Sequence, residues 1–143
     1  MIKGSKGRFR LIINFEEIHN HMKFFLAPMQ GLTGYIVRNA FHHHFDYIDK
    51  YYTPFIPAAK RMNAKIKRDI DPVNNDGITL IPQAMSIVAD EVIDLHRQLA
   101  PYGYDEINVN LGCPSGTVVS KKRGSGILAY PDMLDSFLDE LYT

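Results

Sequence analysis

The sequence contains one cysteine, no tryptophan, no excess of charge of either sign and no long apolar run. A single thiol cannot form a disulfide within the chain, which excludes a disulfide-built secreted domain and predicts a cytoplasmic protein. No apolar run approaches the ~20 residues that a membrane-spanning helix needs. Residues 1–21 mix charges of both signs and are unlike a signal peptide. We therefore expect a soluble cytoplasmic protein that does not enter a membrane.

The formal charges of the sequence balance, because it contains 16 Lys and Arg residues and 16 Asp and Glu residues. The total charge therefore gives no support for a nucleic-acid partner, which usually shows as a basic excess or a basic face. Two local basic clusters remain, at residues 60–68 and at residues 121–123. From charge alone, a solvated loop or helix face is the commoner explanation of each cluster.

Apolar patterns along the chain alternate between those of strands and those of helices. The expected strands are residues 23–29, 47–55, 78–86 and 106–114, and the expected helices are residues 34–45, 88–103 and 131–142. The helix at 88–103 is expected to carry an apolar face of Val88, Val92, Leu95 and Leu99. Residues 60–77 end in the turn-rich DPVNNDG, which predicts a loop. Strands that are each followed by a helix or a long crossover indicate an α/β fold with parallel strands.

Chemically unusual residues follow three of the expected strands. The first strand ends in APMQG, the third in PQAMS and the fourth in NLGCPSG. In parallel α/β folds the ligand site lies at the carboxyl ends of the strands. Gln83 and Asn110 each offer a donor and an acceptor, which suits a heteroaromatic ring with alternating carbonyl and N–H groups. The sequence therefore predicts a pocket for a flat cofactor at these strand ends.

Three segments in this order, FFLAPMQGLTGYIVRNAF, LIPQAMS and INVNLGCPSGTVVSKKRGSGILAYPDML, resemble the tRNA-dihydrouridine synthase family. The resemblance extends over residues 23–142. Members of that family are flavoproteins that reduce selected uridines in transfer RNA. The resemblance implies a TIM barrel that holds FMN, followed by a small helical domain that helps to bind the RNA.

The resemblance also implies roles for individual residues. The positions that match FMN contacts of the family are Pro28, Met29, Gln30, Gln83 and Asn110. Cys113 matches the catalytic cysteine, whose family role is that of general acid. Reduced FMN, recharged by NADPH, delivers hydride to C6 of the uracil, and the thiol protonates C5. An ordinary thiol is protonated at neutral pH and can donate that proton.

The loop KKRGSG places Lys121, Lys122 and Arg123 after the cysteine. The resemblance implies that they contact tRNA phosphates near the target base, which must leave the folded RNA to reach the flavin. The alternative is that these charges are solvated. Neither basic cluster is interleaved with base-stacking aromatic residues, so neither predicts sequence-specific binding.

Taken singly, none of these residues indicates catalysis. A lone cysteine in an α/β protein is more often a small buried hydrophobe, and Met29 alone would be a core residue. Gln83 alone would be a strand-end amide, and Asn110 alone would be a turn former. Only the joint pattern favours the catalytic interpretation.

The three consecutive histidines at residues 42–44 do not predict a metal site. Successive residues of a helix point about a hundred degrees apart and cannot converge on one ion. No Cys/His spacing elsewhere in the sequence matches a zinc site. We therefore expect no metal.

A complete TIM barrel takes ~250 residues. Residues 22–143 are therefore expected to form the first four βα units of a (β/α)8 barrel, and residues 1–21 are an extension whose status the sequence leaves open. The FMN phosphate would be bound by the last two strands of such a barrel. Half of a barrel leaves two strand edges unpaired and exposes its apolar interior, which predicts self-association. Many family members have Asp and Phe where this chain has Gly34 and Val37, a change expected to affect helix capping.

Three functions stay open from the sequence. The first is reduction of tRNA uridine to 5,6-dihydrouridine. The second is the reaction of another FMN-linked TIM-barrel oxidoreductase on a small molecule, which would not need basic loops around Cys113. The third is a catalytically dead fragment that holds no flavin.

Overall fold

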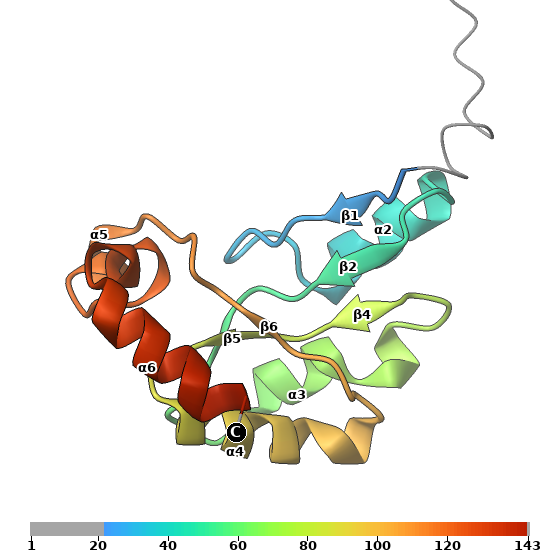
Figure 1. Ribbon diagram of the computed structural model, residues 1–143. Helices are drawn as coiled ribbons and strands as arrows, with labels where there is room; N and C mark the ends of the chain where they lie inside the picture. The colour runs from blue at the N-terminus through green and yellow to red at the C-terminus, as the bar shows by residue number, and fades with distance from the viewer. Residues whose placement is uncertain (1–21, 143) are drawn as a thin grey trace, which may run out of the picture.

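The computed structural model describes residues 22–142 as an α/β fold with parallel strands (Figure 1). Residues 1–21, the predicted N-terminal extension, lie outside the described residues. The strands are β1 (Phe25–Leu26), β2 (Lys50–Tyr52), β3 (Ile56–Pro57), β4 (Leu80–Ile81), β5 (Gln83–Met85) and β6 (Asn108–Val109). The helices are α2 (Tyr35–His44), α3 (Ala64–Ile70), α4 (Ala89–Leu99), α5 (Gly116–Val119) and α6 (Pro131–Tyr142), with 3₁₀ turns η1 (Pro72–Asn74), η2 (Ala100–Tyr102) and η3 (Gly124–Ala129). The predicted α/β class is confirmed.

Four extended segments lie side by side in chain order, and the middle two are each broken into two strands. Strands β1, β2 and β4 form one sheet, and β3, β5 and β6 form a second. Pro54 and Pro82 lie at the breaks, where a proline has no N–H to donate to a neighbouring strand. Thr53 links the two sheets, because its N–H donates to Ile81 O (3.1 Å) and its Oγ1 accepts the N–H of Gln83 (2.9 Å). The expected strands are therefore present but interrupted.

Residues 60–77 contain a helix that was not predicted, α3, and the predicted loop DPVNNDG at the end of this segment contains the short turn η1. The side chain of Asn63 caps α3 by accepting the N–H of Ile66 (3.0 Å). Ile70 is fully buried, and Ile66 packs against the core one turn earlier. This four-residue apolar spacing is that of one helix face. None of the helices in residues 22–142 is long and apolar enough to cross a bilayer.

The main hydrophobic core lies between the second sheet and helices α4 and α6, which pack on each other (Figure 1). Helix α4 contributes Val92, Leu95 and Leu99, each at most 1% exposed, and α6 contributes Phe137. Val88 was predicted on the same face, but it is 45% exposed because it precedes the first turn of α4 as the N-cap residue. The core therefore fixes the β3–β5–β6 half of the fold.

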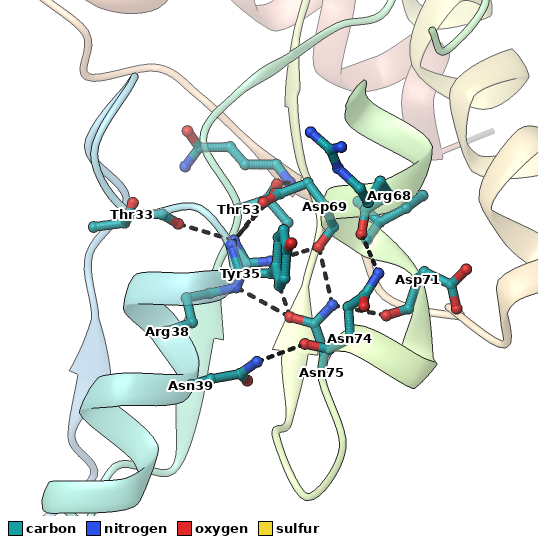
Figure 2. A network of polar contacts seen from close by, with 12 residues as sticks. Thr33, Tyr35, Arg38, Asn39, Thr53, Arg68, Asp69, Asp71, Asn74 and Asn75 are labelled. Atoms are coloured by element: carbon teal, nitrogen blue, oxygen red, sulfur yellow. Dashed lines mark hydrogen bonds and ion pairs between the residues drawn. The ribbon is translucent and has the colours of Figure 1, made fainter. Parts of the chain in front are cut away.

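Helix α2 buries an arginine in place of an apolar stripe. Arg38 is fully buried, whereas Ile36 is 68% exposed. The guanidinium donates to Thr33 O (2.9 Å), to the side-chain oxygen of Asn75 (2.9 and 3.3 Å), and to a carboxylate oxygen (3.1 Å) and the carbonyl oxygen (2.6 Å) of Asp69 (Figure 2). Burial lowers the pKa of Arg38, and the neighbouring Asp69 carboxylate opposes that effect. A buried polar network therefore joins α2 to the α3–η1 segment.

Asp69 also caps the N-terminus of α2 from outside that helix. Gly34 occupies the N-cap position and offers no side chain, and the N–H of Tyr35 donates to Asp69 Oδ1 (2.7 Å). A Cβ added at Gly34 would lie 3.2 Å from the same oxygen. A carboxylate on α3 therefore caps α2, because Gly34 has no side chain that could do so.

The substitution Asp69→Ala is expected to lower the free energy of unfolding by about 3–5 kcal/mol, because it leaves the Arg38 guanidinium buried without its counter-charge. The matched control is Asp94→Ala, which removes an exposed i,i+3 partner of Arg97 and should cost less than about 1 kcal/mol. Urea denaturation followed by circular dichroism measures both values. Equal losses in the two variants would contradict the role given to Asp69.

Candidate active site

A cavity of about 420 Å³ opens at the carboxyl ends of β1, β2 and β4 in the first sheet and of β6 in the second. Its walls include Pro28, Gln30, Phe55, Gln83, Asn110 and Cys113. Parallel strands bring their carboxyl ends to the same edge of a sheet, which explains why residues 85 positions apart in the sequence meet here, as Pro28 and Cys113 do. Five of the sequence-predicted site residues therefore line one cavity.

Three side-chain amides form a hydrogen-bonded chain, and two of them, Gln83 and Asn110, line this cavity. Gln83 Nε2 donates to Asn108 Oδ1 (2.7 Å), and Asn110 Nδ2 donates to Gln83 Oε1 (2.8 Å). Gln83 is only 7% exposed. A primary amide has two N–H donors and an oxygen that can accept twice, so Gln83 keeps one donor and one acceptor site for a ligand.

The chain of amides continues into the turn that carries the thiol. Asn110 Oδ1 accepts the N–H of Cys113 (2.9 Å) and that of Gly112 (3.2 Å). This pattern fixes the start of the turn after β6, and Cys113 lies partly exposed at the cavity wall. The orientation of Gln83 and the position of the thiol turn are thus coupled through a single side chain.

Asn108 contacts the candidate site but was not among the residues predicted from the sequence. It lies two positions before Asn110, and residues two apart in a strand face the same side. The pattern Asn-Val-Asn, which begins with β6 and ends just after it, was therefore a signal for two amides on one face. Only the partner in β5, Gln83, shows what Asn108 does, because it orients that glutamine.

The far side of the thiol turn is held by the segment that begins η3. The carbonyl of Cys113 accepts hydrogen bonds from Ser125 N and Ser125 Oγ, both at 3.1 Å. Gly124 approaches the same carbonyl with a φ of +55°. A β-carbon on Gly124 would lie 2.6 Å from Cys113 O and 3.0 Å from Cys113 Cβ. Glycine is therefore the residue that this close packing requires.

The turn after β1 forms the opposite wall, with Pro28 and Gln30 at the cavity. Met29, which was predicted to contact the cofactor, does not line the cavity and is 53% exposed. Thr33 closes this turn, because its Oγ1 accepts the N–H of Met29 (2.8 Å) and its N–H donates to Met29 O (3.1 Å). Thr33 is in turn held by Arg38, so the buried network of α2 reaches the cavity wall.

The predicted RNA-contacting residues lie beyond the cavity, in the loop between α5 and η3. Lys122 Nζ lies 4.2 Å from the centre of the Tyr130 ring, a cation–π contact. Arg123 pairs with Glu91 of α4 at 3.7 Å. Lys121 is exposed. None of the three basic residues lines the cavity.

Among residues 22–142, no group of three His, Cys, Asp or Glu side chains is placed to share a metal ion. Of the histidines at 42–44, His42 stacks edge-on against Tyr51, with ring centres 5.9 Å apart. The rings of His43 and His44 contact each other on the exposed side of α2.

Replacement of Gly124 by alanine is expected to push the Cys113 turn out of place. Gly103→Ala is the matched control, because Gly103 also has a positive φ (+85°) but has no atom within 4 Å of an added β-carbon. Both variants should lose about 1 kcal/mol or more of stability through backbone strain. Only Gly124→Ala should slow the alkylation of Cys113, the single thiol, by iodoacetamide. Equal alkylation rates in the two variants would contradict the packing role of Gly124.

Comparisons with known proteins agree with this geometry. A family model described as dihydrouridine synthase matches residues 25–143. The tRNA-dihydrouridine synthase B of Pasteurella multocida is 27% identical over 127 residues, which cover 83% of this chain and 36% of that protein. The tRNA-dihydrouridine(20/20a) synthase of Shewanella oneidensis is 32% identical over 63 residues, or 42% of this chain and 19% of that protein. The tRNA-dihydrouridine synthase B of Shigella flexneri is 35% identical over 69 residues, or 48% and 21%.

The chain thus spans little more than a third of the first of these relatives, and less of the others. The four parallel βα units, in chain order, correspond to part of the TIM barrel that is the fold of this family. Because the family model covers most of its length, the chain belongs to the dihydrouridine synthase family.

Proposed function

We propose that this chain carries the thiol and the flavin-ring pocket of an enzyme that reduces uridine to 5,6-dihydrouridine in tRNA. The observation that supports this proposal is that Gln83, Asn110 and Cys113 line one and the same cavity. It combines an oriented amide with a proton-bearing group, and a reductase of a uracil ring needs both. A cytoplasmic location and tRNA as the partner are part of the proposal.

The residues at the cavity fit the flat ring system of FMN. The pyrimidine edge of a flavin alternates carbonyl and N–H groups, and Gln83 keeps one donor and one acceptor site beside it. Pro28 and Phe55 offer apolar surface to a ring. In TIM barrels the loops after strands seven and eight commonly bind the phosphate, so residues 22–142 would hold the ring and leave the phosphate to other loops.

The chain's own part in the reaction is to position the uracil and to supply a proton. Bound FMN, kept reduced by NADPH, would supply the hydride that goes to C6. Cys113 Sγ holds the proton that goes to C5, and the thiolate that remains takes up a proton from solvent. Asn110 fixes the thiol turn through its bonds to the Gly112 and Cys113 N–H groups. Positioned proton transfer of this kind typically accelerates a reaction by about 10²–10⁴-fold.

For the basic loop we propose a division of labour. Lys121 is exposed and would contact an RNA phosphate. Lys122 and Arg123 already contact Tyr130 and Glu91, and these contacts would hold the loop in shape next to the bound RNA. The exposed apolar side chains on β1 and α2, such as Phe25 and Ile36, provide the surface for the expected self-association.

A small-molecule substrate is the second candidate, because none of the three basic residues lines the cavity. A flavin reductase that acts on a free unsaturated carbonyl compound needs the same thiol and amides but no RNA contact. The third candidate, a fragment that binds no flavin, predicts that the cavity stays empty at any FMN concentration. Measurements of FMN binding and of tRNA reduction separate the three candidate functions.

The FMN site is tested by titration of the 143-residue chain with FMN, followed by visible absorbance and flavin fluorescence. Gln83→Leu is expected to weaken binding about tenfold or more, because two hydrogen bonds to the ring are lost. Gln98→Leu, a glutamine outside the cavity, is the matched control and should bind FMN as the unaltered chain does. Failure of the unaltered chain to bind FMN would favour the inactive fragment.

Cys113→Ala tests the reaction itself. This variant should bind FMN normally, because the backbone bonds of the turn remain, but NADPH-dependent reduction of unmodified tRNA should fall by about 10²–10⁴-fold. Dihydrouridine is measured by mass spectrometry of digested tRNA. Reduction of tRNA at an undiminished rate would contradict the proton-donor role, and turnover of small unsaturated carbonyl compounds without tRNA turnover would favour the second candidate.

A further inference from the structure

A second hollow, which we call the α3–α4 groove, lies outside the cavity that holds Cys113. It has a volume of about 820 Å³ and is bounded by residues 58–62, which follow β3, and by helices α3 and α4. Its charged walls are Lys60, Arg61, Lys67, Glu91, Asp94 and Arg97. The groove contains most of the first basic cluster, which the function of the cavity does not use.

The acids of the groove are already engaged, so its free charge is positive. Asp94 pairs with Arg97 at 2.7 Å. Glu91 accepts the hydroxyl of Ser86 and pairs with Arg123. The remaining cations are Lys60, Arg61 and Lys67, and none of them takes part in an ion pair within residues 22–142. Three unpaired cations on one concave wall form a site for an anion with several charges.

The wall that carries these cations is held in place. Met62 is buried, and its N–H donates to the side-chain oxygen of Gln98 on α4 (3.2 Å). Asn63 then caps α3, which fixes the helix that bears Lys67. The cations therefore extend from an ordered backbone.

The groove and the cavity are connected through the same segment of chain. Phe55 lines the cavity and Ala58 lines the groove, with only the two residues of β3 between them. The ion pair between Glu91 and Arg123 joins the groove to the basic loop after Cys113. One ordered stretch of chain, residues 55–62, therefore contributes to the lining of both the cavity and the groove.

We propose that the α3–α4 groove binds the phosphodiester backbone of the RNA, away from the nucleotide that enters the cavity. This inference rests on the proposed tRNA substrate. The cations fit phosphate, because lysine acts as a point charge and the arginine fork binds two phosphate oxygens. Within residues 22–142, Tyr102 is the only aromatic residue that lines the groove, so these residues provide no series of stacking platforms. The contact is therefore independent of base sequence.

The test is the salt dependence of binding of the full chain to an end-labelled, unmodified tRNA transcript, measured by fluorescence anisotropy without FMN or NADPH. The double variant Arg61→Gln/Lys67→Gln removes two groove cations. The matched control Lys65→Gln/Arg68→Gln removes one Lys and one Arg from the same helix region, outside the groove lining. The logarithm of the association constant falls linearly as the logarithm of the salt concentration rises. Each phosphate contact that is lost makes this slope shallower by about 0.7–0.9.

The groove variant should lower that slope by about 1.5 and raise the Kd about tenfold or more near 0.1 M salt, while the control stays close to the unaltered chain. Equal losses in the two variants, or no loss in the groove variant, would overturn the inference. Competition by poly-glutamate as effective as that by RNA of equal charge would also overturn it, because a phosphate-specific site prefers the RNA.

The outcomes separate this inference from the proposed function. If the chain binds tRNA through the groove but reduces no uridine, the groove stands and the proposed reaction fails. If the chain reduces tRNA and the groove variant binds as well as the control, the reaction stands and the groove fails. If the unaltered chain does not bind tRNA at all, both fail.

Discussion

The buried guanidinium of Arg38 is the interaction on which the arrangement of the first half of the fold depends. Arg38 contacts the turn after β1 through Thr33, helix α3 through Asp69 and the turn before β4 through Asn75. Helix α2 buries no large apolar side chain that could hold it instead. A buried charge is costly without its partners, so the position of α2 against the rest of the fold depends on the complete network.

The candidate site is supported from two sides by different kinds of interaction. On one side, the polar network of Arg38 fixes Thr33, and Thr33 closes the turn that brings Pro28 to the cavity. On the other side, close packing of Gly124 and two hydrogen bonds from Ser125 hold the turn of Cys113. The amides of β5 and β6 lie between these supports. The cavity therefore depends on contacts that lie well outside its own lining.

Much of the site could be predicted from the sequence, because strand ends in a parallel fold converge and three short motifs mark them. The features that the sequence did not reveal depend on specific contacts that local patterns do not show. Met29 lies off the cavity because of a turn closed by Thr33, and the burial of Arg38 depends on Asp69, 31 positions later. Helix α3 was missed because charges surround its two isoleucines. Two of the expected strands are each divided in two, because Pro54 and Pro82 at the breaks have no N–H to donate.

The amide chain from Asn108 through Gln83 to Asn110 has a thermodynamic consequence. Asn110 bonds both to Gln83 and to the backbone of the thiol turn, so a ligand held by Gln83 reduces the freedom of that turn. Binding free energies are reciprocal, which means that anything that orders the turn raises the affinity of the ligand by the same factor. Occupancy of the cavity and order in the Cys113 turn are then two measures of one equilibrium.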